Sequence, residues 1–269
     1  MKILWDNYLE DATVTATSED DLFPIENLTD IFLELRYQAE ANQTELTIEF
    51  EENKTVSMIA FGYHNIDNSS GENVITNTYG ASTILTNTYG ADDVYTNTLA
   101  GGYELFDSEG NTVGTGQLNV EDDVSITYPD SVECRTVVLL LTASETLYVG
   151  GMSIGDPMEY ANVLANPEMG DLLRDDVDKT NGGQNYGEQL PMLRSWSVAV
   201  PDPSMTNAKR LATREMLESV GSYQPVYADL WEETDDEPAM YCNFTSIDNY
   251  VRNPYTRTYS FGFTLEECR

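Results

Sequence analysis

The sequence is short of basic residues. Its 269 residues contain 13 Lys and Arg against 47 Asp and Glu, which gives a formal net charge of −34 at pH 7. A surface this acidic repels phosphate backbones and anionic lipid headgroups, so the composition argues against nucleic acid as a partner. Two explanations of the acidity stay open, namely solubility at high ionic strength, where charges are screened, and specific binding of cations.

Reactive side chains are scarce as well. There is one histidine, His64, and three widely spaced cysteines, Cys134, Cys242 and Cys268. No C-x-x-C pair is present, which argues against a zinc site and a disulfide framework. A P-loop, a dinucleotide-binding glycine motif and H-E-x-x-H are absent too, so we expect that the protein is not an enzyme. A glycoside hydrolase that uses two carboxylates is the alternative, because 47 acids always supply a pair at a suitable distance.

Long apolar runs are missing. The longest, Val137–Leu141, is far shorter than the roughly 20 residues of a membrane-spanning helix. The first residues, MKILWDNYLED, lack the apolar core of a secretory signal. We therefore expect no membrane insertion and no signal peptide.

The N-terminal part of the chain, residues 1–155, has the pattern of a β protein. Segment 44–50 (TELTIEF) alternates apolar and polar residues, and segment 55–66 (TVSMIAFGYHNI) is a mostly apolar strand. Further short strands are separated by Gly- and Asn-containing turns, which is typical of a β-sandwich. This pattern predicts a sandwich domain over residues 1–155.

Residues 156–269 show a different pattern, with one strong helix signal. Asp202 is the expected N-cap and Pro203 the first helical residue, and Gly221 is the expected stop. A short helix is also predicted over 157–164, and strands over 192–201, 225–231, 239–247 and 257–267. We predict a smaller α+β domain with one main helix on an antiparallel sheet. The apolar stripe of that helix consists of Met205, Ala208, Ala212, Met216 and Val220.

A ten-residue repeat occupies residues 74–102 (VITNTYGASTILTNTYGADDVYTNTLAGG). Because ten is even, each repeat keeps the same side chains on the same face of a strand. The repeat thus predicts a three-stranded meander or ribbon with a Thr-rich face and an Asn/Tyr face. Such a ribbon either contacts another subunit or a glycan, or is a tolerated duplication; both stay open. The candidate contact residues are Asn77, Tyr79, Asn87, Tyr89 and Tyr95.

Two acidic segments could offer oxygen ligands to calcium. They are 107–111 (DSEGN) and 121–123 (EDD), and neither has the full spacing of an EF-hand loop. The alternative is that the first is an ordinary turn and the second a solvated cluster. No other cofactor is indicated.

Several segments carry a family resemblance. LWDNYLEDATVTATSEDDLFPIENLTD (4–30), LTIEF with TVSMIAFGYHNI (46–66) and TLYVGGMSIGDP (146–157) resemble discoidin-like, galactose-binding-type sandwiches. NGGQNYGEQLPMLRSWSVAVP (181–201) and the segment 240–269 look like the second half of a family of tailed-phage virion proteins. Those proteins combine such a jelly-roll sandwich with a small α+β tail-associated domain.

The resemblance implies a structural component of a tailed virus particle, at the tail tip or baseplate. Such a component would be made in the host cytoplasm, reside in the virion, contact other tail proteins and form a symmetric homo-oligomer. It would act by assembly rather than catalysis. The alternative that the resemblance implies is a carbohydrate-binding, host-recognition module that contacts a surface glycan. Two different tests follow, incorporation into particles for the first and binding to a glycan for the second.

Overall fold

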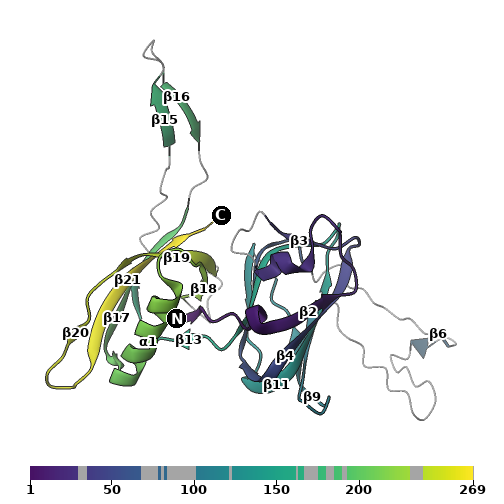
Figure 1. Cartoon of the computed structure of the whole chain (residues 1–269), viewed down its shortest axis with the longest axis horizontal. Helices are drawn as coiled ribbons and strands as arrows, with labels where there is room; N and C mark the ends of the chain where they lie inside the picture. The colour runs from purple at the N-terminus through teal and green to yellow at the C-terminus, as the bar shows by residue number, and fades with distance from the viewer. Residues whose placement is uncertain are drawn as a thin grey trace. The chain divides into compact units, whose positions relative to one another are not determined.

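The computed structural model divides the chain into two compact units, Tyr8–Gly155 and Met1–Asn7 with Asp156–Arg269. We call them the sandwich unit and the α+β unit, and describe each by itself (Figure 1). The predicted fold class, a mainly β chain with a sandwich followed by a smaller α+β part, is confirmed. The structure describes residues 1–29, 35–67, 78–79, 82–83, 101–120, 123–161, 163–166, 175–179, 185–189, 193–230 and 239–268.

The sandwich unit consists of two antiparallel sheets. A five-stranded sheet has the order β2-β4-β11-β8-β9, and a four-stranded sheet has the order β10-β5-β12-β3. Alternate residues of β4 and β11, such as Ile48 and Leu139, are fully buried in one core between them. The strands are β2 (Ala12–Ala16), β3 (Tyr37–Gln38), β4 (Gln43–Val56), β5 (Met58–His64), β8 (Gly102–Phe106), β9 (Thr112–Gln117), β10 (Val124–Thr127), β11 (Val132–Thr142) and β12 (Tyr148–Gly155), with 3₁₀ turns at Tyr8–Asp11 and Ile25–Thr29.

In the α+β unit, one helix, α1, lies across one face of an antiparallel sheet (Figure 1). The order is β13-β1-β18-β19-β21-β17-β14, and β20 pairs with β21. Met216 and Val220 of α1 are buried in the same core as Phe261 and Phe263 of β21. The elements are β1 (Lys2–Leu4), β13 (Met158–Glu159), β14 (Leu164–Asn166), β17 (Ser195–Met205), α1 (Asn207–Val220), β18 (Val226–Asp229), β19 (Met240–Ile247), β20 (Val251–Arg252) and β21 (Tyr259–Glu267), with a separate pair β15 (Asp175–Lys179) and β16 (Asn185–Gln189).

The first seven residues lie in the α+β unit, whereas the sequence-based division placed them with residues 8–155. Lys2 pairs with Asp229 of β18 and, on its other side, with Glu159 of β13. The sequence of a three-residue strand does not indicate which strands it pairs with. Its partners are more than 150 residues away and are brought next to it only when the sheet forms.

The helix begins four residues later than predicted. Residues up to Met205 continue β17, with a register irregularity between Val200 and Met205. Thr206 is the N-cap, and its hydroxyl accepts a hydrogen bond from the amide of Lys209 at 3.2 Å. Asp202 and Pro203 had a suitable local pattern for a helix start, but they lie within β17, which pairs with β21 again at Met205. The predicted stop at Gly221 is where the helix ends, with a φ of +61°.

The short helix predicted over 157–164 does not form. Met158–Glu159 is strand β13 and Leu164–Asn166 is strand β14. Both are edge strands of the large sheet, so backbone pairing replaces the local helical bonds.

Candidate functional site

The arginine cluster

An arginine stacked on two aromatic rings stands out on the sandwich unit. The guanidinium carbon of Arg36 lies 4.6 Å from the ring centroid of Tyr148 and 5.6 Å from that of Phe23. Its Nη2 donates to Oε1 of Gln38 at 3.3 Å. All four side chains are half-buried. We call Phe23, Arg36, Gln38 and Tyr148 the arginine cluster.

Backbone hydrogen bonds hold the arginine cluster in place. The short strand β3 is the edge of the four-stranded sheet, where Gln38 is directly opposite Tyr148. Gln38 donates from its amide to the carbonyl of Phe23 at 3.1 Å. Asn27 donates from its side chain to the carbonyl of Arg36 at 3.0 Å. Residues from three separate segments are therefore fixed together before any ligand arrives.

The charge of Arg36 has no carboxylate within ion-pair distance among the described residues. Half-burying a cation without an acid costs free energy, and the two ring faces offset that cost by cation–π attraction. A guanidinium carries five N–H donors in a planar fork, and one bond to Gln38 leaves most of them for another acceptor. The cluster therefore presents donors on a rigid aromatic support.

Groups that do not form reactive centres

The one histidine is buried and fully hydrogen-bonded. His64 Nδ1 accepts from the amide of Ile66 at 3.1 Å, so its proton is on Nε2, which donates to Oγ of Ser125 at 2.9 Å. This tautomer is the reverse of the one that activates a serine nucleophile, in which the nitrogen facing the hydroxyl accepts. Burial lowers the pKa of His64 to about 4, although Asp123 acts in the opposite direction.

Residues 151–155 (GMSIG) have the G-x-S-x-G spacing of a nucleophile elbow. That motif requires a sharp turn between a strand and a helix. Here it lies inside β12, where Ser153 pairs with Ala60 of β5 in a continuous ladder. The G-x-S-x-G spacing here therefore reflects small residues at alternate positions of a strand and not a nucleophile elbow.

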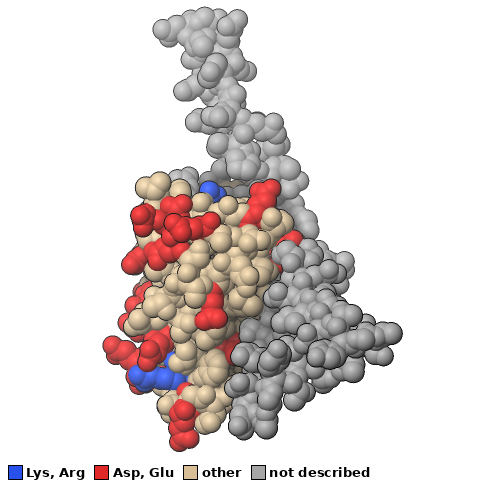
Figure 2. All heavy atoms as spheres, turned by 90° about the vertical axis from the view of Figure 1, so that its right-hand side faces the viewer, with Lys and Arg blue, Asp and Glu red and all other residues tan. Residues whose placement is uncertain are grey.

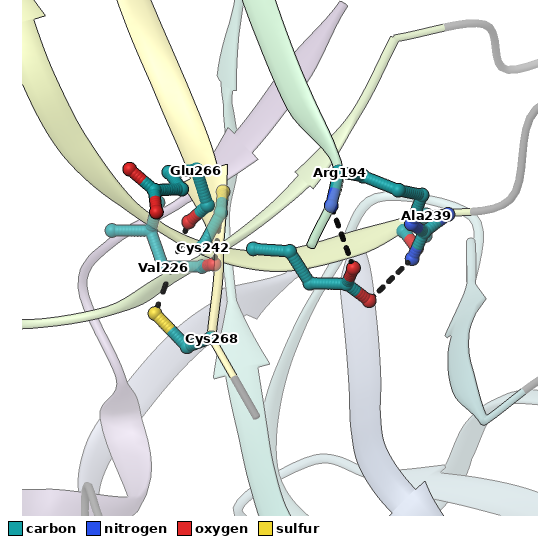
Figure 3. A network of polar contacts seen from close by, with 7 residues as sticks. Arg194, Val226, Ala239, Cys242, Glu266 and Cys268 are labelled. Carbon is teal, nitrogen blue, oxygen red and sulfur yellow. Dashed lines mark hydrogen bonds and ion pairs between the residues drawn. The ribbon is translucent and has the colours of Figure 1, made fainter. Parts of the chain in front are cut away.

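The three thiols are held protonated. Burial raises the pKa of Cys134 to about 11, and that of Cys242 well above its usual value. Burial also raises the pKa of Cys268 to about 11, with Glu266 acting in the same direction. The thiol of Cys242 donates to the carbonyl of Val226 at 3.6 Å and that of Cys268 to the carbonyl of Glu266 at 3.9 Å (Figure 3). Thiolate chemistry is disfavoured at all three positions.

The hydrogen bonds of segment 107–111 argue against calcium binding there. Both carboxylate oxygens of Asp107 accept hydrogen bonds within the turn, from the amides of Glu109 and Asn111 and from the side chain of Asn111. The Asn111 side-chain bond is the first cause of the lowered pKa of Asp107. This is a turn-capping arrangement. Within the described part of the chain, no three His, Cys, Asp or Glu residues gather as a metal site; residues 121–122 lie outside it.

Positions of the predicted contact residues

The candidate contact residues of the repeat lie almost entirely outside the described residues. Asn77, Asn87, Tyr89 and Tyr95 are not described. Tyr79 belongs to β6 (Thr78–Tyr79), whose backbone pairs with β7 (Ser82–Thr83). The contact role of the repeat stays a prediction.

Arg36, Phe23 and Tyr148 were not predicted as site residues from the sequence. One signal was present, since Arg36 is one of only 13 basic residues in a very acidic chain. Its two aromatic partners are 13 and 112 positions away, so only the folded sheet brings them together.

Comparison with known proteins

No family model and no curated protein matches the chain. Among the helices of the described residues, none is long and apolar enough to span a membrane. Solved structures with a similar chain fold include chitosan-binding module 1 of a chitosanase/glucanase from Paenibacillus sp. IK-5, with 9% identity and a TM-score of 0.38 over 56% of this chain and 99% of that one. A fucose-binding module of Streptococcus pneumoniae has 12% identity and a TM-score of 0.37, over 56% of this chain and 94% of that one. At this level of identity, function has to be argued from the chain's own residues.

Proposed function

We propose that the protein is a non-catalytic binding protein whose arginine cluster recognises a carbohydrate. The observation that carries this proposal is the guanidinium of Arg36, stacked on the rings of Tyr148 and Phe23 with no carboxylate of the described residues within ion-pair distance. Within the part of the chain that the structure describes, the N–H donors of Arg36 that do not bond Gln38 are open to an external acceptor.

The chemistry of the cluster fits a sugar. Adjacent hydroxyl oxygens, or the carboxylate of an acidic sugar, match the planar fork of donors of Arg36. Gln38 adds an amide that both donates and accepts, as a hydroxyl does. The two aromatic rings supply apolar surface for the C–H face of a pyranose. Rigid support from β3 and from Asn27 lowers the entropy lost on binding.

A glycan array followed by titration calorimetry tests the proposal. Wild-type protein should bind at least one glycan, and Arg36→Ala should weaken binding at least about tenfold, or about 1.4 kcal/mol. Arg36→Lys separates charge from fork geometry and should recover only part of the affinity. The matched control is Lys54→Ala, which removes another cation stacked on a ring, 5.4 Å from the centroid of Tyr8. Absence of any glycan ligand, or equal losses for Arg36→Ala and Lys54→Ala, would refute the proposal.

A role in a virus tail is a second proposal, favoured by the exposed surface of the α+β unit. Tyr255 is 94% exposed, Val251 64% and Tyr223 72%. Large exposed apolar and tyrosine side chains are typical of protein–protein contacts. Mass spectrometry of purified virus particles tests this role directly. Absence of the chain from every particle would contradict it and would leave glycan binding unaffected.

A further inference from the structure

The few basic residues are unevenly distributed between the two units. Residues 8–155 contain only three of the 13, Arg36, Lys54 and Arg135, together with more than half of the 47 acids. By contrast, 249–262 (NYVRNPYTRTYSFG) carries two arginines and no acid. The α+β unit thus has a locally basic segment in an acidic protein.

That segment is a hairpin next to the helix. β20 pairs with β21, so that Arg252 is opposite Tyr259. The guanidinium of Arg210, on α1, lies 5.0 Å from the ring centroid of Tyr259. The guanidinium of Arg210 donates to the side chain of Asn207 on its own helix, and no described carboxylate is within ion-pair distance of Arg210, Arg252 or Arg257. We call Arg210, Val251, Arg252, Tyr255 and Arg257 the basic hairpin patch.

The tip of the basic hairpin patch is a preorganised turn. Asn253 accepts at its side-chain oxygen from the amide of Tyr255 at 3.0 Å, and at its carbonyl from the amide of Arg257 at 3.1 Å. Tyr255 nevertheless remains 94% exposed, and Val251 64%. Tyrosine and arginine on a rigid, exposed support are the residue types that dominate binding energy between proteins. This composition favours a protein as the partner.

The chain itself offers a complementary surface on the outer face of the five-stranded sheet. Val138 and Leu140 of β11 alternate with the fully buried Val137, Leu139 and Leu141 and are half-buried. Glu45 of β4 is directly opposite Leu140, and Glu104 of β8 is directly opposite Val138. Glu49 continues the row along β4. We call Glu45, Glu49, Glu104, Val138 and Leu140 the acidic sheet face.

The face of the molecule drawn in Figure 2 is predominantly acidic. The view in Figure 2 shows acidic side chains spread over the described surface, with little Lys or Arg among them. An apolar strip bordered by glutamates matches an exposed tyrosine and valine bordered by arginines.

We propose that the basic hairpin patch of one molecule docks on the acidic sheet face of a second copy of this chain. The two surfaces differ, so the contact is heterologous, and copies add head to tail, which gives a ring where the rotation between copies closes. The inference rests on the virus-tail proposal and deepens it by naming a self-association contact, and it is independent of glycan binding. Local opposite charges also offset the repulsion that molecules of net charge −34 would otherwise experience.

Sedimentation velocity tests the docking with charge reversals on each surface. At about 0.15 M salt and about 50 µM protein, wild type should sediment as a dimer or larger ring. Arg252→Glu with Arg257→Glu should weaken association at least about tenfold, and so should Glu45→Arg with Glu49→Arg. Mixing the two double variants should restore a complex, because the reversed charges again match. Circular dichroism checks that each variant is folded.

A control pair changes the net charge equally at other positions. Lys54→Glu with Lys179→Glu makes the same change of charge, with Lys179 in the separate β15–β16 pair, and should leave association within about twofold of wild type. A monomeric wild type would overturn the inference. So would an equal loss in the control pair, or a failure of the mixed variants to associate. Particle incorporation is measured separately, so the virus-tail proposal can survive a monomeric result through contacts with other proteins.

Discussion

His64 Nε2 lies 2.9 Å from Oγ of Ser125, and both side chains are buried in the sandwich unit. Its other ring nitrogen accepts from the amide of Ile66. Protonation of Nδ1 would place two N–H groups against each other, so only the neutral ring keeps both hydrogen bonds. The single histidine is therefore a structural group with a strong preference for one charge state.

The first prediction concerns stability in acid. His64 has a pKa of about 4 in the folded protein against 6.5 for the ordinary side chain. The unfolded state therefore binds more protons between these values, and the contribution of His64 is complete above pH 6.5 and is lost as pH falls towards 4. We expect a loss of about 3 kcal/mol over this window, measured by urea unfolding.

His64→Gln is the control for the acid effect, because many carboxylates also titrate below pH 6. Glutamine does not ionise, so the difference in unfolding free energy between wild type and variant isolates the histidine. That difference should shrink between pH 6.5 and 4. A constant difference would mean that the folded pKa of His64 is not depressed.

The second prediction concerns the ion pair that closes the C-terminal strand. Nη2 of Arg194 is 3.1 Å from Oε1 of Glu267, whose side chain is 2% exposed. The main-chain amide of Arg194 donates to Oε2 of the same carboxylate. Arg194→Ala leaves a buried carboxylate without its charge partner, and we expect a loss of about 3–5 kcal/mol in urea unfolding. The control is Arg214→Ala, which breaks an exposed ion pair with Glu218 and should cost about 0.5 kcal/mol or less. Equal losses of unfolding free energy for Arg194→Ala and Arg214→Ala would contradict a stabilising role of the buried ion pair.

The third prediction concerns close packing between β8 and β9. A Cβ on Gly116 would be 2.6 Å from the hydroxyl and 2.7 Å from ring atoms of Tyr103, the residue directly opposite. Gly116→Ala should therefore displace the ring and lower the unfolding free energy by about 1–3 kcal/mol. Gly114→Ala is the comparison, because its Cβ would contact only the flexible side chain of Leu105, at 3.2 Å. A larger effect at Gly114 would refute the packing argument.

The fourth prediction concerns the start of α1. Thr206→Ala removes the hydroxyl that accepts from the amide of Lys209, which should cost about 1 kcal/mol. Asp202→Ala should cost less than about 0.5 kcal/mol, because the backbone of Asp202 belongs to β17 and the N-cap of α1 is Thr206. Thermal unfolding of both variants distinguishes the two positions. A larger loss of stability for Asp202→Ala than for Thr206→Ala would support Asp202 as the N-cap.

Local patterns in the sequence predicted those parts of the fold that depend on local physics. Alternation in 44–50 predicted β4, and Gly221 predicted the end of α1. The start of α1 was predicted wrongly, because Asp202 and Pro203 satisfy the local rule while pairing with β21 extends the strand beyond them. Local propensity gives way where a sheet neighbour supplies backbone hydrogen bonds.

The arginine cluster could not be predicted from the sequence, because its residues are far apart in the chain. Arg36 and Tyr148 become neighbours only because β3 joins the edge of a sheet next to β12. No spacing rule connects positions 112 residues apart. The repeat at 74–102 was predicted as a contact ribbon because its similar residues lie close together in the chain, where a sequence pattern can be recognised.

The pairing of β1 with β13 has a consequence for how the protein can be dissected. Lys2 and Glu159 are partners on adjacent antiparallel strands, so the chain leaves the α+β unit and returns to it at nearly the same place. The 148 intervening residues of the sandwich unit, Tyr8–Gly155, are nested between two neighbouring strands. A short hairpin turn could replace them without breaking the large sheet, and the excised sandwich could be transplanted as an independent module.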